Sequence, residues 1–248
     1  MCRMIAAVGQ VPVQALWDGL RLMAANENST HRHERRSLGA DFRHEHGWGS
    51  AWTENGRLRV HRSPRSVLDD PRSEAAMRRI KPPLVLLHAR RASRGVPRRS
   101  NTHPFSLDFL GRDWAFCHNG TIDDHGSLRR VPGLAPEGGT DSERLFHHLM
   151  SCVAARYDGD LTAALAAGLA DGIARLRDYT AAHCLLATHD RIIAIAARHP
   201  ERSQPDYHAL WEGCGDGFRV VSSEPVDGLG CTWTRPAEPA VITLEVKG

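Results

Sequence analysis

The first nine residues, MCRMIAAVG, form a short apolar run that a glycine ends. Such a run predicts a buried strand that begins at the very first residue. Chain ends are usually left loose, so a strand here would draw the N-terminus into the protein interior. Because initiator methionine is normally removed when the next residue is small, we expect the mature chain to start at Cys2. That residue would then carry a free α-amino group beside its thiol.

Composition excludes several classes of protein. The chain has 248 residues, of which 41% are hydrophobic and 25% charged, and these values are ordinary for a globular protein. Its six cysteines lack the C-x-x-C spacing of zinc sites, no secretory peptide precedes them, and no apolar run approaches the ~20 residues of a membrane helix. The basic residues are nearly all arginine, which is typical of a GC-rich bacterial genome. We expect a bacterial, cytoplasmic protein with free thiols and no membrane contact.

The order of predicted elements is strands, two helices, then strands. We expect a helix over 11–25, a loop over 26–45, a hairpin over 48–61 turning at Asn55-Gly56, and strands over 84–88 and 114–122. Thr140 and Glu143 predict a capping box at the start of a helix, and a second helix follows over 161–176. Further strands are predicted over 182–188, 191–197, 208–211, 218–222 and 241–246. No repeat or linker divides the chain, so a single domain over 1–248 is expected, with helices outside sheets.

Cys2 is the first candidate for catalysis. An α-amine has a pKa near 7.7 to 8, so it could accept the thiol proton and make one residue both nucleophile and general base. Many proteins simply begin with Met-Cys, so this feature alone is a weak indication.

A second candidate follows the strand over 84–88, where Arg90 opens a loop that contains five arginines between Arg90 and Arg99. A guanidinium at a strand end can bind a carboxylate through two parallel hydrogen bonds. The same loop could instead be a solvated basic segment, or a phosphate-binding surface for nucleic acid.

Two further candidates lie at Asn119-Gly120 and at Asp141. An asparagine amide and the following glycine N–H can together hold an oxyanion, although this dipeptide more often marks a tight turn. Asp141, at a helix start, is explained either by the helix dipole or by a salt bridge to a substrate ammonium.

Taken together and in this order, these motifs resemble the class II glutamine amidotransferases, and above all their small stand-alone members. The resemblance runs from Cys2 to about Met150, and the strands over 182–223 fit the second half of the fold. It rests on Met1-Cys2-Arg3, Gly47-Trp48-Gly49, His88-Ala89-Arg90, Asn101-Thr102-His103-Pro104-Phe105, His118-Asn119-Gly120 and Gly139-Thr140-Asp141-Ser142-Glu143. The chain departs from larger members at Arg91 and Arg94, where they have Trp and His, and at His46, where Asp is usual.

The resemblance implies an α+β fold, the four-layer αββα sandwich of N-terminal-nucleophile hydrolases. It implies Cys2 as nucleophile, Asn119 and Gly120 as oxyanion hole, and Arg90, Ser93 and Asp141 as substrate-binding residues. The reaction it implies is hydrolysis of a γ-glutamyl amide through a thioester, without a cofactor. The amine released is ammonia from glutamine or a larger amine, as in amidohydrolases of thiol metabolism. Alternatively, the chain is a glutaminase subunit that passes ammonia to a separate synthase or other protein subunit.

Two protein classes other than the amidotransferases also fit parts of the sequence. Fifteen histidines, including His31-Arg32-His33 and His44-Glu45-His46, could suggest a metal hydrolase. No H-E-x-x-H motif accompanies them, so we expect no metal and expect most of the histidines to be solvated loop residues. An Arg-rich nucleic-acid-binding protein is the non-enzyme alternative, but interleaved aromatic residues are missing and the net charge is only +3.

Overall fold

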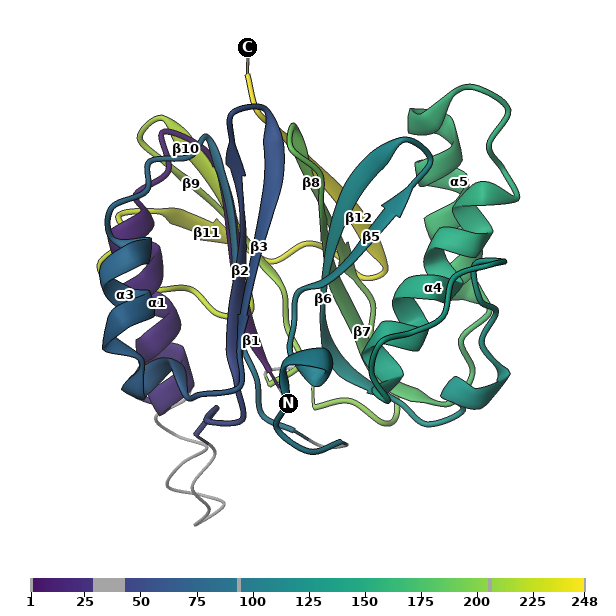
Figure 1. The fold of residues 1–248 in the computed structure, drawn as a ribbon, viewed down its shortest axis with the longest axis horizontal. Helices are drawn as coiled ribbons and strands as arrows, with labels where there is room; N and C mark the ends of the chain where they lie inside the picture. The colour runs from purple at the N-terminus through teal and green to yellow at the C-terminus, as the bar shows by residue number, and fades with distance from the viewer. Residues whose placement is uncertain (1, 29–42, 93–94, 205–206, 248) are drawn as a thin grey trace.

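The computed structural model describes residues 2–28, 43–92, 95–204 and 207–247 (Figure 1). The first half of the chain contains β1 (Arg3–Gly9), α1 (Val13–Ala25), β2 (Trp48–Glu54), β3 (Arg57–Ser63), α3 (Pro71–Met77), β4 (Leu84–Ala89), β5 (Phe105–Phe109) and β6 (Arg112–Ile122). The second half contains α4 (Asp141–Ala154), α5 (Leu161–Ala174), β7 (Tyr179–Ala187), β8 (Arg191–Ala196), β9 (Trp211–Gly215), β10 (Phe218–Ser222), β11 (Thr232–Thr234) and β12 (Ala240–Glu245). Within the described ranges, no helix is long and apolar enough to cross a membrane.

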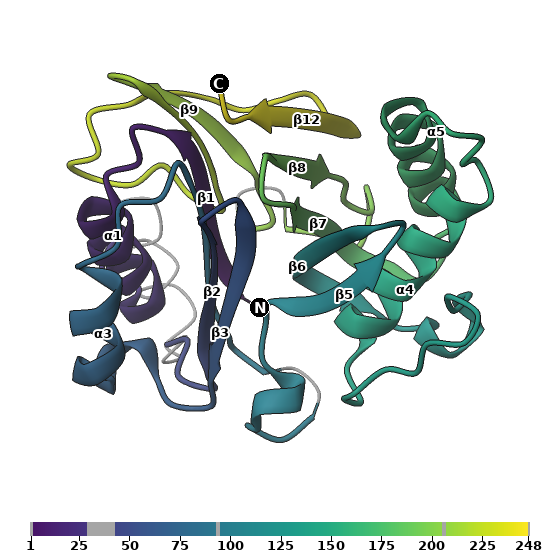
Figure 2. The same cartoon turned by 45° about the horizontal axis from the view of Figure 1, so that its top comes forward.

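The strands form two antiparallel sheets that face each other. One sheet has the order β11-β9-β10-β1-β4-β2-β3 and the other has the order β12-β8-β7-β6-β5. Helices α1 and α3 cover the outer face of the first sheet, and α4 and α5 cover the outer face of the second (Figures 1 and 2). This arrangement confirms the predicted αββα sandwich.

Three apolar clusters fill the spaces between the four layers. One lies between α1 and the first sheet, one between the two sheets, and one between the second sheet and helices α4 and α5. Along β1, Met4 and Val8 contribute to the cluster between the sheets, whereas Ile5 contributes to the cluster under α1. A strand that lies between two apolar cores must be apolar on both faces, because successive side chains point to opposite faces.

Most predicted elements are present, and the hairpin turn is confirmed. Asn55 and Gly56 both have positive φ, at 52° and 72°, as a two-residue hairpin loop requires. Four elements differ from the prediction. The loop expected between β4 and β6 contains strand β5, the strand expected over 208–211 lies later as β9, and α3 and β11 were not predicted.

The capping box at α4 is only half correct. Thr140 Oγ1 accepts a hydrogen bond from the Glu143 backbone N–H at 3.2 Å, as predicted. The Glu143 carboxylate does not return to Thr140, because it accepts hydrogen bonds from the N–H groups of Glu137 and Gly138, each at 2.8 Å. Glu143 therefore ties the loop before α4 to the helix, a tertiary role that the local spacing did not reveal.

Candidate active site

Cys2 faces the space between the two sheets. It precedes Met4 by two residues, so the alternation of β1 turns both side chains toward the same inner layer. The residue is only 8% exposed, and its Sγ lies 3.9 Å from the carbonyl oxygen of Arg91. The predicted nucleophile thus lies at the edge of the inner core, where the loop that follows β4 begins.

Asn119 reaches the same layer from the opposite sheet. Ala115 and Cys117 on β6 pack between the sheets, and Asn119 continues this alternation. Its Oδ1 accepts a hydrogen bond from the Cys2 backbone nitrogen at 3.0 Å. Asn119, the predicted oxyanion-hole residue, therefore binds Cys2, the predicted nucleophile. Its Nδ2 is buried and has no hydrogen-bond partner among the described residues.

Gly120 lies in a bulge of β6, and this excludes the interpretation of Asn119-Gly120 as a turn. The pairing with β7 shifts between Gly120 and Ile122, so the ladder is interrupted next to Asn119. Gly120 has φ +150°, and a Cβ at this position would lie 1.8 Å from the backbone oxygen of Ala181. The close approach of β7 leaves room for glycine alone, so the backbone here is held in one conformation beside the asparagine amide.

Arg90 extends β4 toward Cys2. Its backbone pairs with residues 46–47, and its guanidinium donates hydrogen bonds to the carbonyl oxygens of His46 at 3.4 Å and Gly95 at 3.2 Å. Burial lowers the pKa of Arg90, and the nearby Cys2 and Asp141 oppose this shift. The guanidinium is therefore a nearly buried cation within electrostatic range of both predicted site residues.

Asp141 is the first residue of α4 and is 4% exposed. Its Oδ2 accepts a hydrogen bond from the backbone N–H of Ile122 at 2.9 Å, at the end of β6. This contact joins the start of α4 to the strand that carries Asn119. The structure thus brings Cys2, Arg90, Asn119, Gly120 and Asp141 to one end of the sandwich, whereas Ser93 lies outside the described residues.

Histidines form a large part of this region, and the expectation that most of them are solvated is wrong. Eight of the fifteen are buried, namely His44, His88, His103, His118, His147, His148, His183 and His208, whereas His31 and His33 lie outside the described residues. His88 pairs in register with Met4, and its ring packs against that of His103 with centroids 4.1 Å apart and ring planes tilted by 33°. Burial lowers the pKa of His88 to about 3 and that of His103 well below its ordinary value. Both imidazoles are therefore neutral near pH 7.

Comparison with known proteins relates this geometry to one family. The sequence profile described as class-II glutamine amidotransferases matches residues 28–205. The chain belongs to this family. It is 34% identical over 115 residues to the Escherichia coli protein YafJ, a match that covers 46% of this chain and 45% of YafJ. The chain therefore spans less than half of that relative.

Solved amidotransferase structures share the fold. The allosteric regulatory enzyme of purine biosynthesis superposes with a TM-score of 0.71 and 20% identity, covering 98% of this chain and 47% of that one. A glutamine aminotransferase class-II domain protein from Silicibacter pomeroyi superposes with a TM-score of 0.57 and 18% identity, and each chain is covered completely. At this level of identity the likeness concerns the fold alone. The sequence resemblance to class II glutamine amidotransferases is confirmed.

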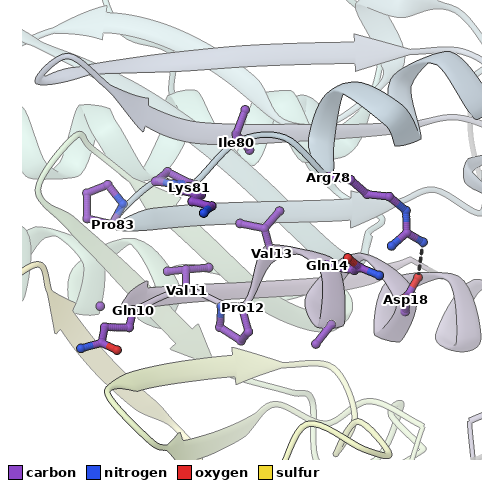
Figure 3. A pocket seen from close by; sticks show the side chains of 13 residues that line it. Gln10, Val11, Pro12, Val13, Gln14, Asp18, Arg78, Ile80, Lys81 and Pro83 are labelled. Carbon is purple, nitrogen blue, oxygen red and sulfur yellow. Dashed lines mark hydrogen bonds and ion pairs between the residues drawn. The ribbon is translucent and has the colours of Figure 1, made fainter.

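A cavity of about 870 Å³ lies elsewhere in the chain, at the opposite end of β1 (Figure 3). Val11, Lys81 and Pro83 are among its lining residues, and Arg78 binds Asp18 at its rim at 2.7 Å. It begins at Gly9, whereas Cys2 immediately precedes the first residue of β1. Seven strand residues span roughly 20 Å, so this cavity is separate from the Cys2 region.

Sequence reasoning missed the residues that hold Cys2 in place. Arg3 is fully buried, forms an ion pair with the buried Glu224, and donates a hydrogen bond to the Cys2 carbonyl oxygen at 3.2 Å. Its guanidinium carbon lies 4.5 Å from the ring centroid of Tyr207. The position of Arg3 inside an apolar predicted strand could have indicated such a pair, because a buried arginine requires a partner.

Proposed function

We propose that this chain hydrolyses a γ-glutamyl amide and releases glutamate and an amine. One observation carries the proposal: Asn119 binds the backbone nitrogen of Cys2 through Oδ1 while its buried Nδ2 has no partner in the described structure. Buried amide donors are ordinarily satisfied, so an unused one beside a thiol supports a role toward a ligand oxygen. Family membership supports the same reaction class.

In the proposed mechanism, Met1 has been removed and the α-amine of Cys2 takes the thiol proton. The sulfur attacks the side-chain carbonyl carbon of the γ-glutamyl group, and the carbonyl oxygen becomes an oxyanion that Asn119 Nδ2 and the Gly120 N–H stabilise. The tetrahedral intermediate collapses as the leaving amine receives the proton from the α-ammonium, which leaves a γ-glutamyl thioester. Water activated by the α-amine then hydrolyses the thioester, which restores the thiol and releases glutamate.

The same proposal assigns the residues that hold the amino-acid end of the substrate. Arg90 binds the α-carboxylate and Asp141 binds the α-ammonium, which places the carbonyl near Cys2. The positions of the two residues support these roles, because both are nearly buried and Arg90 lies close enough to Cys2 and to Asp141 to interact with each electrostatically. Ser93 lies outside the described residues, and its role toward the glutamyl group stays a prediction.

The leaving amine distinguishes two forms of the reaction. Arg98 and Arg99 are exposed on the loop that follows Arg90, and free glutamine needs no cations beyond the one that binds its carboxylate. This supports a γ-glutamyl amide with an additional anionic group as the preferred substrate.

We expect purified protein to cleave such an amide, for example glutathione, with a higher kcat/KM than glutamine. Glutamate release from glutamine, glutathione and neutral γ-glutamyl amides measures the preference. If glutamine is cleaved at least as efficiently as every other amide tested, or if activity requires a second protein, the preference for a larger amide is wrong. In the second case an ammonia-delivering subunit is supported.

Replacing Asn119 by alanine should lower kcat by ~10²-fold or more and leave KM nearly unchanged, because the lost donor acts only on the transition-state oxyanion. Steady-state kinetics with a thermal unfolding curve for the variant would measure both effects. A raised KM with unchanged kcat would instead assign Asn119 to positioning of the chain or substrate.

A further inference from the structure

Three metal-ligating side chains converge at the amino end of β1. The Sγ of Cys2 and one ring nitrogen each of His88 and His103 all lie within 4.8 Å of one another. The three residues come from β1's leading end, from β4 and from the segment before β5, so only the folded chain brings them together. The proposed hydrolysis uses the thiol but assigns no step to either histidine.

His103 supplies an independent observation. It is 2% exposed, and neither of its ring nitrogens has a hydrogen-bond partner in the described structure. Its ring packs between His88 and Phe105, with centroid distances of 4.1 Å and 4.6 Å. A buried, unpartnered imidazole next to a thiol has the donor atoms that a borderline-soft cation requires.

We propose that Cys2, His88 and His103 form a binding site for a thiophilic divalent cation such as Zn²⁺, which blocks the nucleophile reversibly. Zn²⁺ accepts one thiolate at about 2.3 Å and imidazole nitrogens at about 2.0 Å, with water in a remaining position. Tetrahedral coordination requires the ligand atoms to approach by roughly one ångström. On binding, the thiol proton is released to solvent and the sulfur coordinates the metal.

The site differs from that of a metal hydrolase, because the metal occupies the sulfur that performs the proposed attack. Bound Zn²⁺ therefore inhibits hydrolysis, and a chelator restores it. The inference does not rest on the proposed function, since binding is read directly from the protein without turnover.

Calorimetric titration of chelator-treated protein with ZnCl₂ tests the site. We expect one Zn²⁺ per chain, binding at least tenfold weaker in His103→Gln and His88→Gln, and no site in Cys2→Ala. His147→Gln is the matched control, because His147 is also buried but lies on α4 outside the cluster. Unchanged affinity in the two histidine variants, or an unchanged site in Cys2→Ala, would overturn the proposal, as would absence of binding to the unmodified protein.

A second measurement needs no variant, should one of them fail to fold. X-ray absorption at the zinc edge of the unmodified protein with one equivalent of Zn²⁺ should show one sulfur and two imidazole nitrogens. A zinc coordination shell without sulfur, or one with sulfur but no imidazole nitrogen, would refute the assigned ligands. If metal-free protein releases no glutamate although Zn²⁺ binds as expected, the proposed hydrolysis is contradicted and the metal site is supported.

Discussion

Replacing Cys2 by alanine is expected to abolish glutamate release and to leave the fold intact. The substitution removes the attacking sulfur, and no neighbouring group in the proposed mechanism can form the thioester. The side chain is small and lies at the edge of the inner core, so its loss removes little packing. Initial rates on the best γ-glutamyl amide and a thermal unfolding curve would measure the two effects separately.

Cys214→Ala is the matched control for this experiment, because Cys214 is an exposed free cysteine on β9 and should be dispensable. Intact mass of the active protein should also show that Met1 is absent, since only a free α-amine can act as the base. Residual activity in Cys2→Ala would place the nucleophile elsewhere. Active protein that retains Met1 would exclude the amine as base.

Glu224→Ala should lower the free energy of unfolding by roughly 3–5 kcal/mol, the usual effect of breaking a buried ion pair from one side. Arg3 and Glu224 are both essentially inaccessible to solvent, and Glu224 also accepts a hydrogen bond from Asn28 at 2.8 Å. The variant leaves the Arg3 guanidinium buried without this carboxylate. Because Arg3 donates to the Cys2 carbonyl oxygen, kcat should fall as well.

Urea unfolding monitored by circular dichroism would measure the change in stability. Glu212→Ala provides the control, because the Arg219–Glu212 pair lies at the surface and its loss should cost no more than about 1 kcal/mol. A loss of stability in Glu224→Ala no larger than that in Glu212→Ala would show that the buried pair does not hold the N-terminal strand in place.

The local sequence pattern was sufficient to predict elements that depend on only a few neighbouring residues. The hairpin at Asn55-Gly56 and the helix that begins after Thr140 were predicted from turn and cap chemistry, which depends on neighbours in the chain. The short strand β5 was missed although Phe105, Leu107 and Phe109 alternate with polar residues, because the pattern covers only five residues and directly follows an Arg- and Pro-rich segment. Helix α3 was missed although Asp70 caps it and Pro71 occupies its first turn.

The candidate site was predicted in part for the same reason. Cys2, Arg90 and Asp141 lie at the ends of predicted elements and Asn119 lies within a predicted strand, and motif chemistry indicated them one at a time. The assignment of the histidines to solvated loops failed, because an isolated histidine in a sequence has no local signature of burial. His103 is buried where its ring packs against His88 of β4 and against Phe105.

The sequence by itself determined the alternation of β1, the caps and turns, and the residue types available for amide chemistry, because each depends on backbone geometry within one element. Only the tertiary structure decided which of these residues meet. Asn119 and Cys2 are 117 residues apart in sequence yet share a hydrogen bond, and Glu224 reaches Arg3 from the far end of the chain. Such contacts depend on which strands pair within each sheet and on how the two sheets pack face to face. The alternation of apolar residues shows which side chains point inward, but it does not specify which strand lies opposite.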